Sequence, residues 1–297
     1  MAEEILDDED ILARLGNRNA ALLGSGGEAQ VYALDDRRVA RIMRPGATAE
    51  DAHGRAALLQ EIAAGNSTLP FATPEVLEIA VLGARVAAVE RRLDGQPMSA
   101  VLPTVIGRER LQLVQAYLEA AERLHEIELS RPFFGPLLGG EDVRSKTWRG
   151  FLQQRLALSA RTCPPDLRAA VLDPAICALP PSPAPRLVHL DYFPANVLVA
   201  NGAVSAVLDF GPTALAGDPR LDLWSAVAYL DNAITPVADE DDRRFAAIWL
   251  EARGLLPDYA PARRWLAAYW THAADDAQLM AWCRGCFCLA RRVPDRA

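Results

Sequence analysis

The first ninety residues alternate between short apolar runs and turn residues. Five of these runs carry the valine, isoleucine, leucine and tyrosine side chains that are typical of strands. We predict strands over Ala21 to Leu23, Gln30 to Leu34, Arg38 to Met43, Pro74 to Ile79 and Ala84 to Val89. Ala49 to Ala64 is rich in alanine, leucine and glutamate, and it predicts a helix that ends near Gly65-Asn66. This pattern indicates a small lobe with five strands around one helix.

Beyond the turn residues Asp94 to Pro97, the apolar positions follow a helical spacing, and Arg108 to Leu129 predicts one long helix. Residues 130–185 contain many prolines, so we expect this stretch to be irregular. Short strands follow, the last two joined as a hairpin at Asn201-Gly202: Leu187-Val188, Val197 to Ala200 and Val204 to Leu208. Helical spacing resumes at Leu221. The chain therefore predicts an α+β fold with an antiparallel-sheet lobe (residues 1–92), a connection at about 90–97, and a mainly helical lobe (93–297).

Composition narrows the class of protein. The 297 residues carry a formal net charge of −8, whereas proteins that bind nucleic acid usually have a basic excess. No apolar run approaches the roughly 20 residues that cross a bilayer, and Met1 to Asp10 is acidic, unlike a signal peptide. We therefore expect a cytoplasmic protein that binds neither nucleic acid nor membrane. The acidic surface either serves solubility or attracts cationic substrates.

Two further features of the composition concern cysteine and lysine. Cys283, Cys286 and Cys288 form a C-x-x-C-x-C cluster, which reads either as a zinc or redox site or as small apolar residues on a helix. The second interpretation is favoured, because zinc normally takes four ligands and His272 is the only histidine nearby. Lys146 is the only lysine, so any site that normally uses lysine needs inspection.

A glycine-rich segment lies between the first two predicted strands. It runs from Gly24 through Ser25, Gly26 and Gly27 to Val31. Glycine lets a backbone approach phosphate oxygens closely and adopt positive φ. The segment does not open a helix, as a dinucleotide-binding fingerprint does, and it lacks the Gly-Lys-Ser/Thr end of a Walker A loop. It matches the Gly-x-Gly-x-x-Gly-x-Val loop of protein kinases, with alanine at the third glycine.

Two motifs in the second half of the chain carry the chemistry of phosphoryl transfer. His189 to Asn196 has the pattern His-x-Asp-x-x-x-x-Asn, in which Asp191 can orient an attacking hydroxyl. Asn196 and Asp209, the latter in an Asp-Phe-Gly triplet, offer oxygen ligands to Mg²⁺. The ordered set, with a glycine-rich loop before it, predicts transfer from a nucleoside triphosphate. Taken singly, the three residues could also be turn residues that cap strands.

At these residues the chain resembles the aminoglycoside-phosphotransferase and choline-kinase-like branch of the protein-kinase-like superfamily. The resemblance covers about residues 20–232 and rests on Leu187 to Val199, on Gly217 to Leu223, and on Arg123-Leu124-His125. It implies a protein-kinase-like fold of two lobes. It also implies that Asp191 is the catalytic base and that Asn196 and Asp209 bind Mg²⁺.

The resemblance assigns supporting roles as well. Asp222 would brace the catalytic loop that contains His189, although its position equally suits a carboxylate at a helix N-terminus. Glu61 would pair with the cation that binds phosphate, or else it faces solvent on its helix. That cation is Arg41, which stands where the family places lysine. Arginine keeps the charge but differs in shape and reach.

The nucleobase would meet backbone groups of the connection from Glu90 to Arg92, by the same resemblance. The sequence leaves ATP and GTP open as cofactors. The expected partner is a small molecule with a hydroxyl group, bound by a monomer or homodimer. Acidic runs at residues 239–242 and 275–276, or aromatic residues on the C-terminal helices, could line the acceptor pocket, but the favoured interpretations are solvated faces for the acidic runs and helical core for the aromatic residues.

Three functions fit this sequence. The first is a kinase for an aminoglycoside, a related antibiotic or an amino sugar. The second is a metabolic kinase for choline, homoserine, fructosamine or another sugar derivative. The third is a nucleotide-binding pseudokinase without turnover, which Arg41 would favour and the retained Asp191 and Asp209 disfavour.

Overall fold

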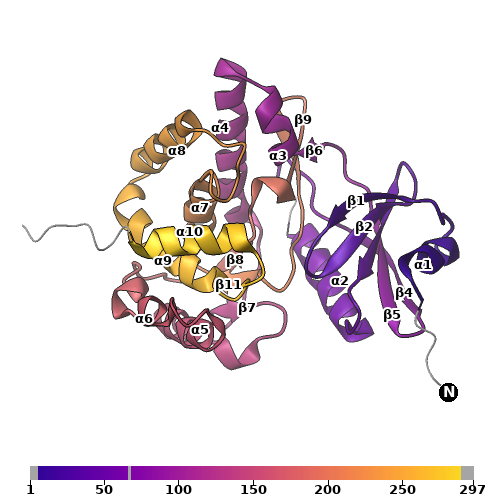
Figure 1. Cartoon of the computed structure of the whole chain (residues 1–297), viewed down its shortest axis with the longest axis horizontal. Coiled ribbons are helices and arrows are strands. Elements are labelled where there is room, and N and C mark those ends of the chain that lie inside the picture. The colour runs from indigo at the N-terminus through magenta and orange to yellow at the C-terminus, as the bar shows by residue number, and fades with distance from the viewer. Residues whose placement is uncertain (1–5, 66–67, 289–297) are drawn as a thin grey trace, which may run out of the picture.

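The structure is a computed structural model that describes residues 6–65 and 68–288 (Figure 1). Two parts of the predictions lie outside the described residues: residues 1–5 of the acidic N-terminal stretch, and Asn66 at the predicted end of the first helix. Figure 1 shows a small lobe with β1 to β5 beside a larger, mainly helical lobe. The predicted α+β architecture with two lobes is confirmed.

The small lobe contains a five-stranded antiparallel sheet in the order β1-β2-β3-β5-β4. Its strands are β1 (Ala21–Ser25), β2 (Ala29–Ala33), β3 (Arg38–Met43), β4 (Val76–Leu82) and β5 (Arg85–Arg91). Side chains alternate between the two faces of a strand, so Ala40 and Ile42 of β3 pack toward α1 (Asp8–Arg14). Met43 packs toward Ala52 of α2 (Ala49–Ala64). Arg41, in phase with Met43, therefore points to the α2 face of the sheet.

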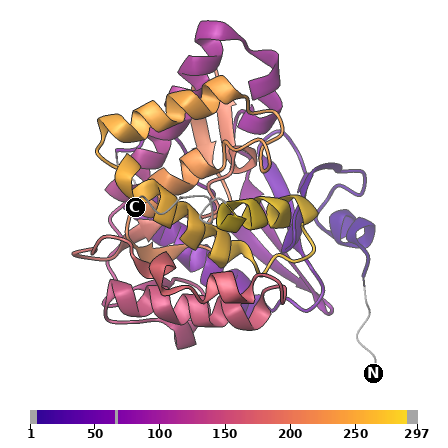
Figure 2. The same cartoon turned by 60° about the vertical axis from the view of Figure 1, so that its left-hand side comes forward.

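The large lobe is built from helices around one continuous core. They are α3 (Met98–Val101), α4 (Gly107–Arg123), α5 (Trp148–Thr162), α6 (Arg168–Val171), α7 (Arg220–Ala228), α8 (Glu240–Ala252), α9 (Tyr259–Trp270) and α10 (Ala277–Cys288). Trp224, Trp265 and Trp282 are among its largest fully buried side chains. In Figure 2 the C-terminal helices, orange to yellow, lie between α4 at the top and α5 at the bottom.

Two small sheets and several 3-10 turns complete this lobe. One sheet has the order β10-β9-β6 and the other β7-β11-β8. The strands are β6 (Gln96–Pro97), β7 (Gly135–Pro136), β8 (Arg186–Val188), β9 (Val197–Ala200), β10 (Ala203–Val207) and β11 (Leu215–Gly217). The 3-10 turns are Leu102–Thr104, Leu124–Glu126, Glu141–Val143, Pro174–Cys177, Pro194–Asn196 and Leu256–Asp258. No described helix is long and apolar enough to cross a membrane.

Most predicted elements form within one or two residues of their expected limits, but the expectation for residues 130–185 is wrong in its middle. There α5 runs for 15 residues without a proline. Thr147 caps its first turn by accepting a hydrogen bond from the Gly150 backbone N–H at 3.2 Å. The prolines that suggested an irregular segment lie outside this helix. The short helix α1 was not predicted either.

The segment that leaves β5 passes so close to the β9–β10 hairpin that it requires glycine at position 95. Gly95 has φ of +120°, which side-chain-bearing residues rarely adopt. A Cβ atom there would also lie 2.9 Å from the Val199 carbonyl oxygen. The segment is thereby held against β9, with which β6 pairs. Since β9 follows the Asp191 loop directly, this contact joins the small lobe to the predicted catalytic loop.

Candidate active site

Asp222 organises the loop between β8 and β9 that contains Asp191. The carboxylate of Asp222 is buried on α7 and accepts hydrogen bonds from the backbone N–H groups of His189 and Leu190, both at 2.8 Å. Leu190 has φ of +65°, an unfavourable conformation for leucine that these bonds help to hold. The Tyr229 hydroxyl donates a further bond to the Leu190 carbonyl at 2.8 Å. Asp222 therefore braces the loop through its backbone.

His189 links this loop to the Asp-Phe-Gly segment. Its ring is buried and its Nε2 lies 2.6 Å from the carbonyl oxygen of Leu208, so Nε2 carries the proton in this bond. Burial lowers the pKa of His189, which favours the neutral ring. The ring also packs on Phe210, with centroids 4.5 Å apart. His189 therefore supports the loop as a buried, neutral side chain.

The β9–β10 hairpin brings Asn196 and Asp209 together. Val197 pairs with Val207, and one step further the Leu208 N–H donates to the Asn196 carbonyl at 2.8 Å. The Asn196 side-chain amide donates to the backbone carbonyl of Asp191 at 2.9 Å. Its amide oxygen receives no hydrogen bond from the described residues. The hairpin thus places two groups with oxygen atoms that could bind a metal ion, an amide and a carboxylate, at the end of the Asp191 loop.

The carboxyl group of Asp191 lies in an environment that disfavours its charge. Burial raises the pKa of Asp191 well above its usual value, and the nearby carboxylates of Asp209 and Glu28 raise it further. Arg41 opposes this effect. A carboxylate whose proton affinity is raised in this way is a stronger base than an exposed one.

Arg41 lies beside the carboxylates of the site. Its Nη2 is 2.9 Å from Oδ1 of Asp209 and 3.4 Å from Oε2 of Glu28. Burial alone would lower the pKa of Arg41, but Asp209, Glu90 and Glu28 together raise it above its ordinary value. The arginine therefore keeps its charge and stands at the position that the resemblance assigns to lysine.

The glycine-rich loop is the tip of the β1–β2 hairpin. The Gly26 N–H donates to the Ala29 carbonyl at 2.9 Å, and Arg44 donates to the Gly26 carbonyl at 2.8 Å and to the Ser25 hydroxyl at 3.0 Å. None of Gly24, Gly26 and Gly27 has the positive φ that glycine permits. A Cβ atom at these positions would meet no other atom closer than 3.9 Å. Neither conformation nor internal packing therefore demands these glycines, and the space beside Gly24 and Gly27 is open.

Glu61 does not meet the cation that it was expected to pair with. Both of its carboxylate oxygens bind Arg131 of the large lobe, at 2.6 and 2.7 Å. The expectation of a Glu61–Arg41 pair is therefore wrong for this structure. The reason is the rotation of α2, which turns Glu61 toward the segment that follows α4 rather than toward the sheet.

Glu90 and Arg92 make contacts within the small lobe. The side chain of Glu90 is buried and binds Arg55 of α2 at 2.5 Å. The backbone N–H of Arg92 donates to the Arg37 carbonyl at 2.8 Å. That N–H is therefore occupied by a bond within the protein. Contact between the nucleobase and other backbone groups from Glu90 to Arg92 stays a prediction.

Sequence reasoning missed Glu28 and Arg55. Burial raises the pKa of Glu28, and the charge of Asp209 raises it further, while the charges of Arg41 and Arg55 lower it. A signal for Arg55 was present, because it falls in the buried stripe of α2 with Ala52, Leu59 and Ile62. An arginine in an apolar stripe indicates a buried partner.

The acidic run at residues 239–242 borders a hollow of about 290 Å³ whose lining does not include Asp191. Asp239 caps α8, and its side chain accepts from the Asp242 N–H at 2.9 Å. Asp242 is buried and binds Arg110 at 2.6 Å. Asp276 caps α10 by accepting from the Leu279 N–H at 2.8 Å. Asp239, Asp242 and Asp276 thus hold helices in place, and the expectation of a solvated face does not hold for the buried Asp242.

Aromatic side chains gather beside Asp191. Phe193 stacks on Tyr229, with ring centroids 3.9 Å apart, and lies 5.6 Å from the ring of Trp270. The Trp270 indole donates to the Tyr229 hydroxyl at 2.7 Å. Tyr229 and Trp270 are buried in the helical core, as is Trp265, whereas Phe193 is partly exposed. The aromatic wall next to the loop thus comes from α7, α9 and the loop itself.

The three cysteines at the C-terminal end of the described chain form no metal cluster. Cys283 and Cys286 are buried in the core, and Cys288 is exposed. Within residues 6–65 and 68–288 no group of three or more histidine, cysteine or acidic side chains is arranged to hold a metal ion. Cys283 and Cys286 pack as small apolar residues of α10 in the core of the large lobe.

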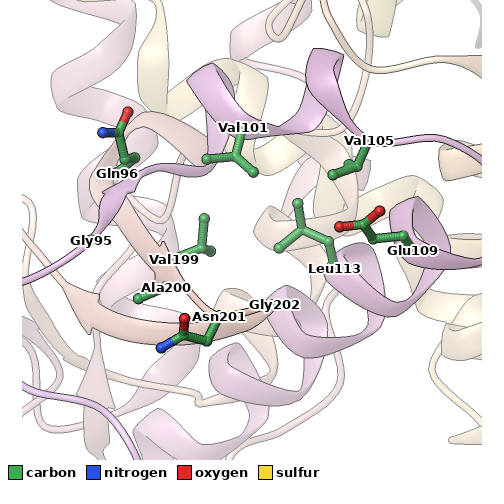
Figure 3. Close-up of a pocket in the computed structure, with 10 residues that line it drawn as sticks. All are labelled: Gly95, Gln96, Val101, Val105, Glu109, Leu113, Val199, Ala200, Asn201 and Gly202. Carbon is green, nitrogen blue, oxygen red and sulfur yellow. The ribbon is translucent and has the colours of Figure 1, made fainter.

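A separate hollow of about 350 Å³ lies between α3, α4 and the β9–β10 hairpin (Figure 3). Its wall is apolar, with Val101, Val105, Leu113 and Val199, and the Glu109 carboxylate points toward it. Asp191, Asn196, Asp209 and Arg41 do not line this hollow. It therefore lies apart from the candidate active site.

Comparison with known proteins agrees with this arrangement. The model of the family described as "Phosphotransferase enzyme family" matches residues 19–269. No curated protein sequence matches the chain significantly.

Several solved structures share the fold. A thermostable mutant of aminoglycoside phosphotransferase APH(4)-Ia, in a ternary complex with AMP-PNP and hygromycin B, is 21% identical with a TM-score of 0.59, over 95% of this chain and 98% of that one. The gentamicin complex of APH(2")-IIa is 15% identical with a TM-score of 0.63, over 96% and 97%. Macrolide 2'-phosphotransferase MphH from Brachybacterium faecium is 19% identical with a TM-score of 0.52, over 94% and 96%.

The family match covers both lobes and every motif from the glycine-rich loop to the Asp-Phe-Gly triplet. The order and spacing of these motifs, the two-lobed fold and the gathered carboxylates all agree with it. The chain belongs to the phosphotransferase enzyme family.

Proposed function

We propose that this enzyme transfers the γ-phosphoryl group of ATP or GTP to a hydroxyl group of a small molecule. The observation that carries the proposal is the placement of Asp191, Asn196, Asp209 and Arg41 around one end of the β9–β10 hairpin. One carboxylate with raised proton affinity, two oxygen donors and one buried cation are the groups that phosphoryl transfer requires.

In this proposal Asp191 accepts a hydrogen bond from the acceptor hydroxyl and takes its proton as the new phosphate ester bond forms. The Asp222 bonds to the loop backbone fix the direction of the Asp191 side chain. Phosphoryl transfer depends mainly on positioning, so a rigid loop is worth more here than a reactive nucleophile. The proton affinity of Asp191, raised by burial, improves it as a base.

The small lobe, residues 1–92, would hold the triphosphate through Arg41 and the backbone of the glycine-rich loop. Asn196 and Asp209 of the other lobe would hold Mg²⁺, and their hard oxygen donors suit this ion. The bound metal ion would neutralise charge on the phosphate oxygens. The Arg41–Asp209 contact supports this assignment, because it would bring the cation that binds phosphate next to the carboxylate that holds the metal ion.

For the acceptor we propose an aminoglycoside or a related antibiotic or amino sugar. The similarity in fold to proteins solved with hygromycin B and gentamicin supports this class. Phe193, which is partly exposed and backed by the buried rings of Tyr229 and Trp270, would pack against the apolar face of a sugar ring.

The test is release of ADP or GDP by the purified protein with Mg²⁺ and a panel of aminoglycosides, macrolides, choline, homoserine and sugar amines. We expect release that depends on one acceptor class and is lost in Asp191→Asn. Release with choline or homoserine alone would replace the proposed acceptor class with a metabolic one. Nucleotide binding without release would instead indicate a pseudokinase.

A further inference from the structure

The small-lobe sheet presents a buried acidic side chain, Glu90, on the same face as Arg41. In the register of β3 and β5, Val39 pairs with Glu90 and Arg41 with Ala88. Paired residues of antiparallel strands point to the same face, so Arg41 and Glu90 are diagonal neighbours, a separation of roughly 7 Å. Glu90 is only 6% exposed. Its charge is close enough to raise the pKa of Arg41.

Arg55 supplies the partner of this buried carboxylate from the facing helix. It is 4% exposed and its Nη1 lies 2.5 Å from Oε1 of Glu90. Its charge also lowers the pKa of Glu28 at the end of the glycine-rich loop, against the larger opposing effect of burial. Arg55 therefore faces the sheet from α2, at the position of Glu90. A buried pair of this kind costs considerable desolvation, so stability alone does not explain its presence.

Protein kinases fix their phosphate-binding lysine with a glutamate from this helix. Here the corresponding strand residue is Arg41, and the helix presents another cation. We propose that the Arg55–Glu90 pair positions Arg41 for the triphosphate, with Glu90 as the anionic residue between two arginines. The carboxylate that protein kinases place on the helix is here Glu90 of β5, and the helix supplies Arg55 as its ion-pair partner.

This arrangement accounts for two observations together. Glu61, the helix glutamate that sequence reasoning chose, is engaged by Arg131 of the large lobe. Arg41 nevertheless has its guanidinium held next to Asp209. Without an anion on its other side, Arg41 would be drawn wholly to Asp209 and Glu28. In this proposal the charge of Glu90 opposes that attraction. The ion pair with Arg55 keeps Glu90 from forming a direct ion pair with Arg41.

The inference rests on the proposed function, and nucleotide affinity tests it without an acceptor. Dissociation constants for Mg²⁺ with a non-hydrolysable ATP analogue and for Mg-GDP would be measured by calorimetry for Glu90→Gln, Arg41→Gln and the double variant. We expect Glu90→Gln to weaken binding roughly tenfold in the wild-type background and by less than about twofold when Arg41 is already Gln. Equal losses in both backgrounds would overturn the inference, because a residue with a merely structural role would weaken both alike.

Two further variants keep the test decisive. Glu90→Gln leaves Arg55 buried without its partner, so the protein could unfold. Arg55→Gln with Glu90→Gln removes both charges and should fold, yet still bind nucleotide roughly tenfold more weakly. Wild-type affinity in this double variant would refute the positioning role. Asp8→Asn is the matched control, because Asp8 binds the buried Arg85 at the far end of β5, at 2.8 Å.

We expect Asp8→Asn to lower the melting temperature and to leave nucleotide affinity within about twofold. These measurements distinguish failure of the proposed function from failure of the positioning role of the Arg55–Glu90 pair. A wild-type protein that binds neither nucleotide would overturn the proposed function and this inference with it. A wild-type protein that binds nucleotide and releases ADP, with Glu90→Gln unchanged, would overturn this inference alone.

Discussion

Tyr117 of α4 and Tyr192 of the catalytic loop exchange hydrogen bonds inside the large lobe. The Tyr117 hydroxyl donates to the Tyr192 carbonyl at 2.6 Å, and the Tyr192 hydroxyl donates to the Tyr117 carbonyl at 2.9 Å. Both side chains are fully buried, and their rings stack with centroids 4.8 Å apart. The two bonds look equivalent, but their loss should not cost the same.

The carbonyl of Tyr117 lies inside a helix and also accepts the helical bond from four residues on. Tyr192→Phe therefore loses one hydrogen bond and leaves no acceptor unsatisfied, at about 1 kcal/mol. The carbonyl of Tyr192 lies in a loop and has no other donor among the described residues. Tyr117→Phe leaves it buried without a partner, which should cost about 2–3 kcal/mol.

Urea unfolding followed by circular dichroism would measure both variants, and phenylalanine keeps the ring stack in each. At about 2 °C per kcal/mol for a chain of this size, we also expect melting temperatures lower by about 2 °C for Tyr192→Phe and about 5 °C for Tyr117→Phe. Equal costs, or a larger cost for Tyr192→Phe, would refute the reasoning. Because Tyr192 follows Asp191, Tyr117→Phe should also reduce turnover more than Tyr192→Phe.

Three further results are expected. Because burial and neighbouring carboxylates raise the pKa of Asp191, and only its ionised form accepts the proton, kcat/KM should rise with pH through an apparent pKa well above the ordinary value of about 4; a pH–rate profile that stays flat down to pH 5 would contradict this. Arg41→Lys keeps the charge but loses the forked geometry, so calorimetry should find nucleotide bound several-fold more weakly; unchanged affinity would remove that geometry from the account. Glu61→Gln should leave nucleotide affinity within about twofold, because Glu61 binds Arg131 and not the site; a tenfold loss would restore the role first expected of it.

The parts of the site that sequence could predict are those set by neighbouring residues along the chain. Asn196 and Asp209 meet because a short hairpin, turned at Asn201-Gly202, joins the strands beside them. Their spacing is therefore visible in the sequence itself. The same holds for the glycine-rich loop, which is the tip of a hairpin. Local turn chemistry is enough to place such groups.

The part that sequence missed depends on how a helix is rotated against the sheet. Arg55 and Glu61 belong to the same correctly predicted helix, but six residues separate their directions by roughly 120°. Packing of Ala52, Leu59 and Ile62 decides which of the two faces Arg41. The family resemblance favoured the glutamate, whereas the buried stripe of the helix contains the arginine. Tertiary packing, rather than local preference, selected the residue.

The most direct test of the proposed reaction is transfer of label from [γ-³²P]ATP or GTP to an acceptor, followed for wild type and Asp191→Asn. Asp173→Asn, which removes a carboxylate that binds Arg264 at 2.7 Å away from the motifs, serves as the matched control. The account predicts labelled acceptor with wild type and the control, and none above background with Asp191→Asn, although that variant still binds nucleotide. Labelled acceptor formed equally by Asp191→Asn would contradict the assignment of Asp191 and the mechanism built on it.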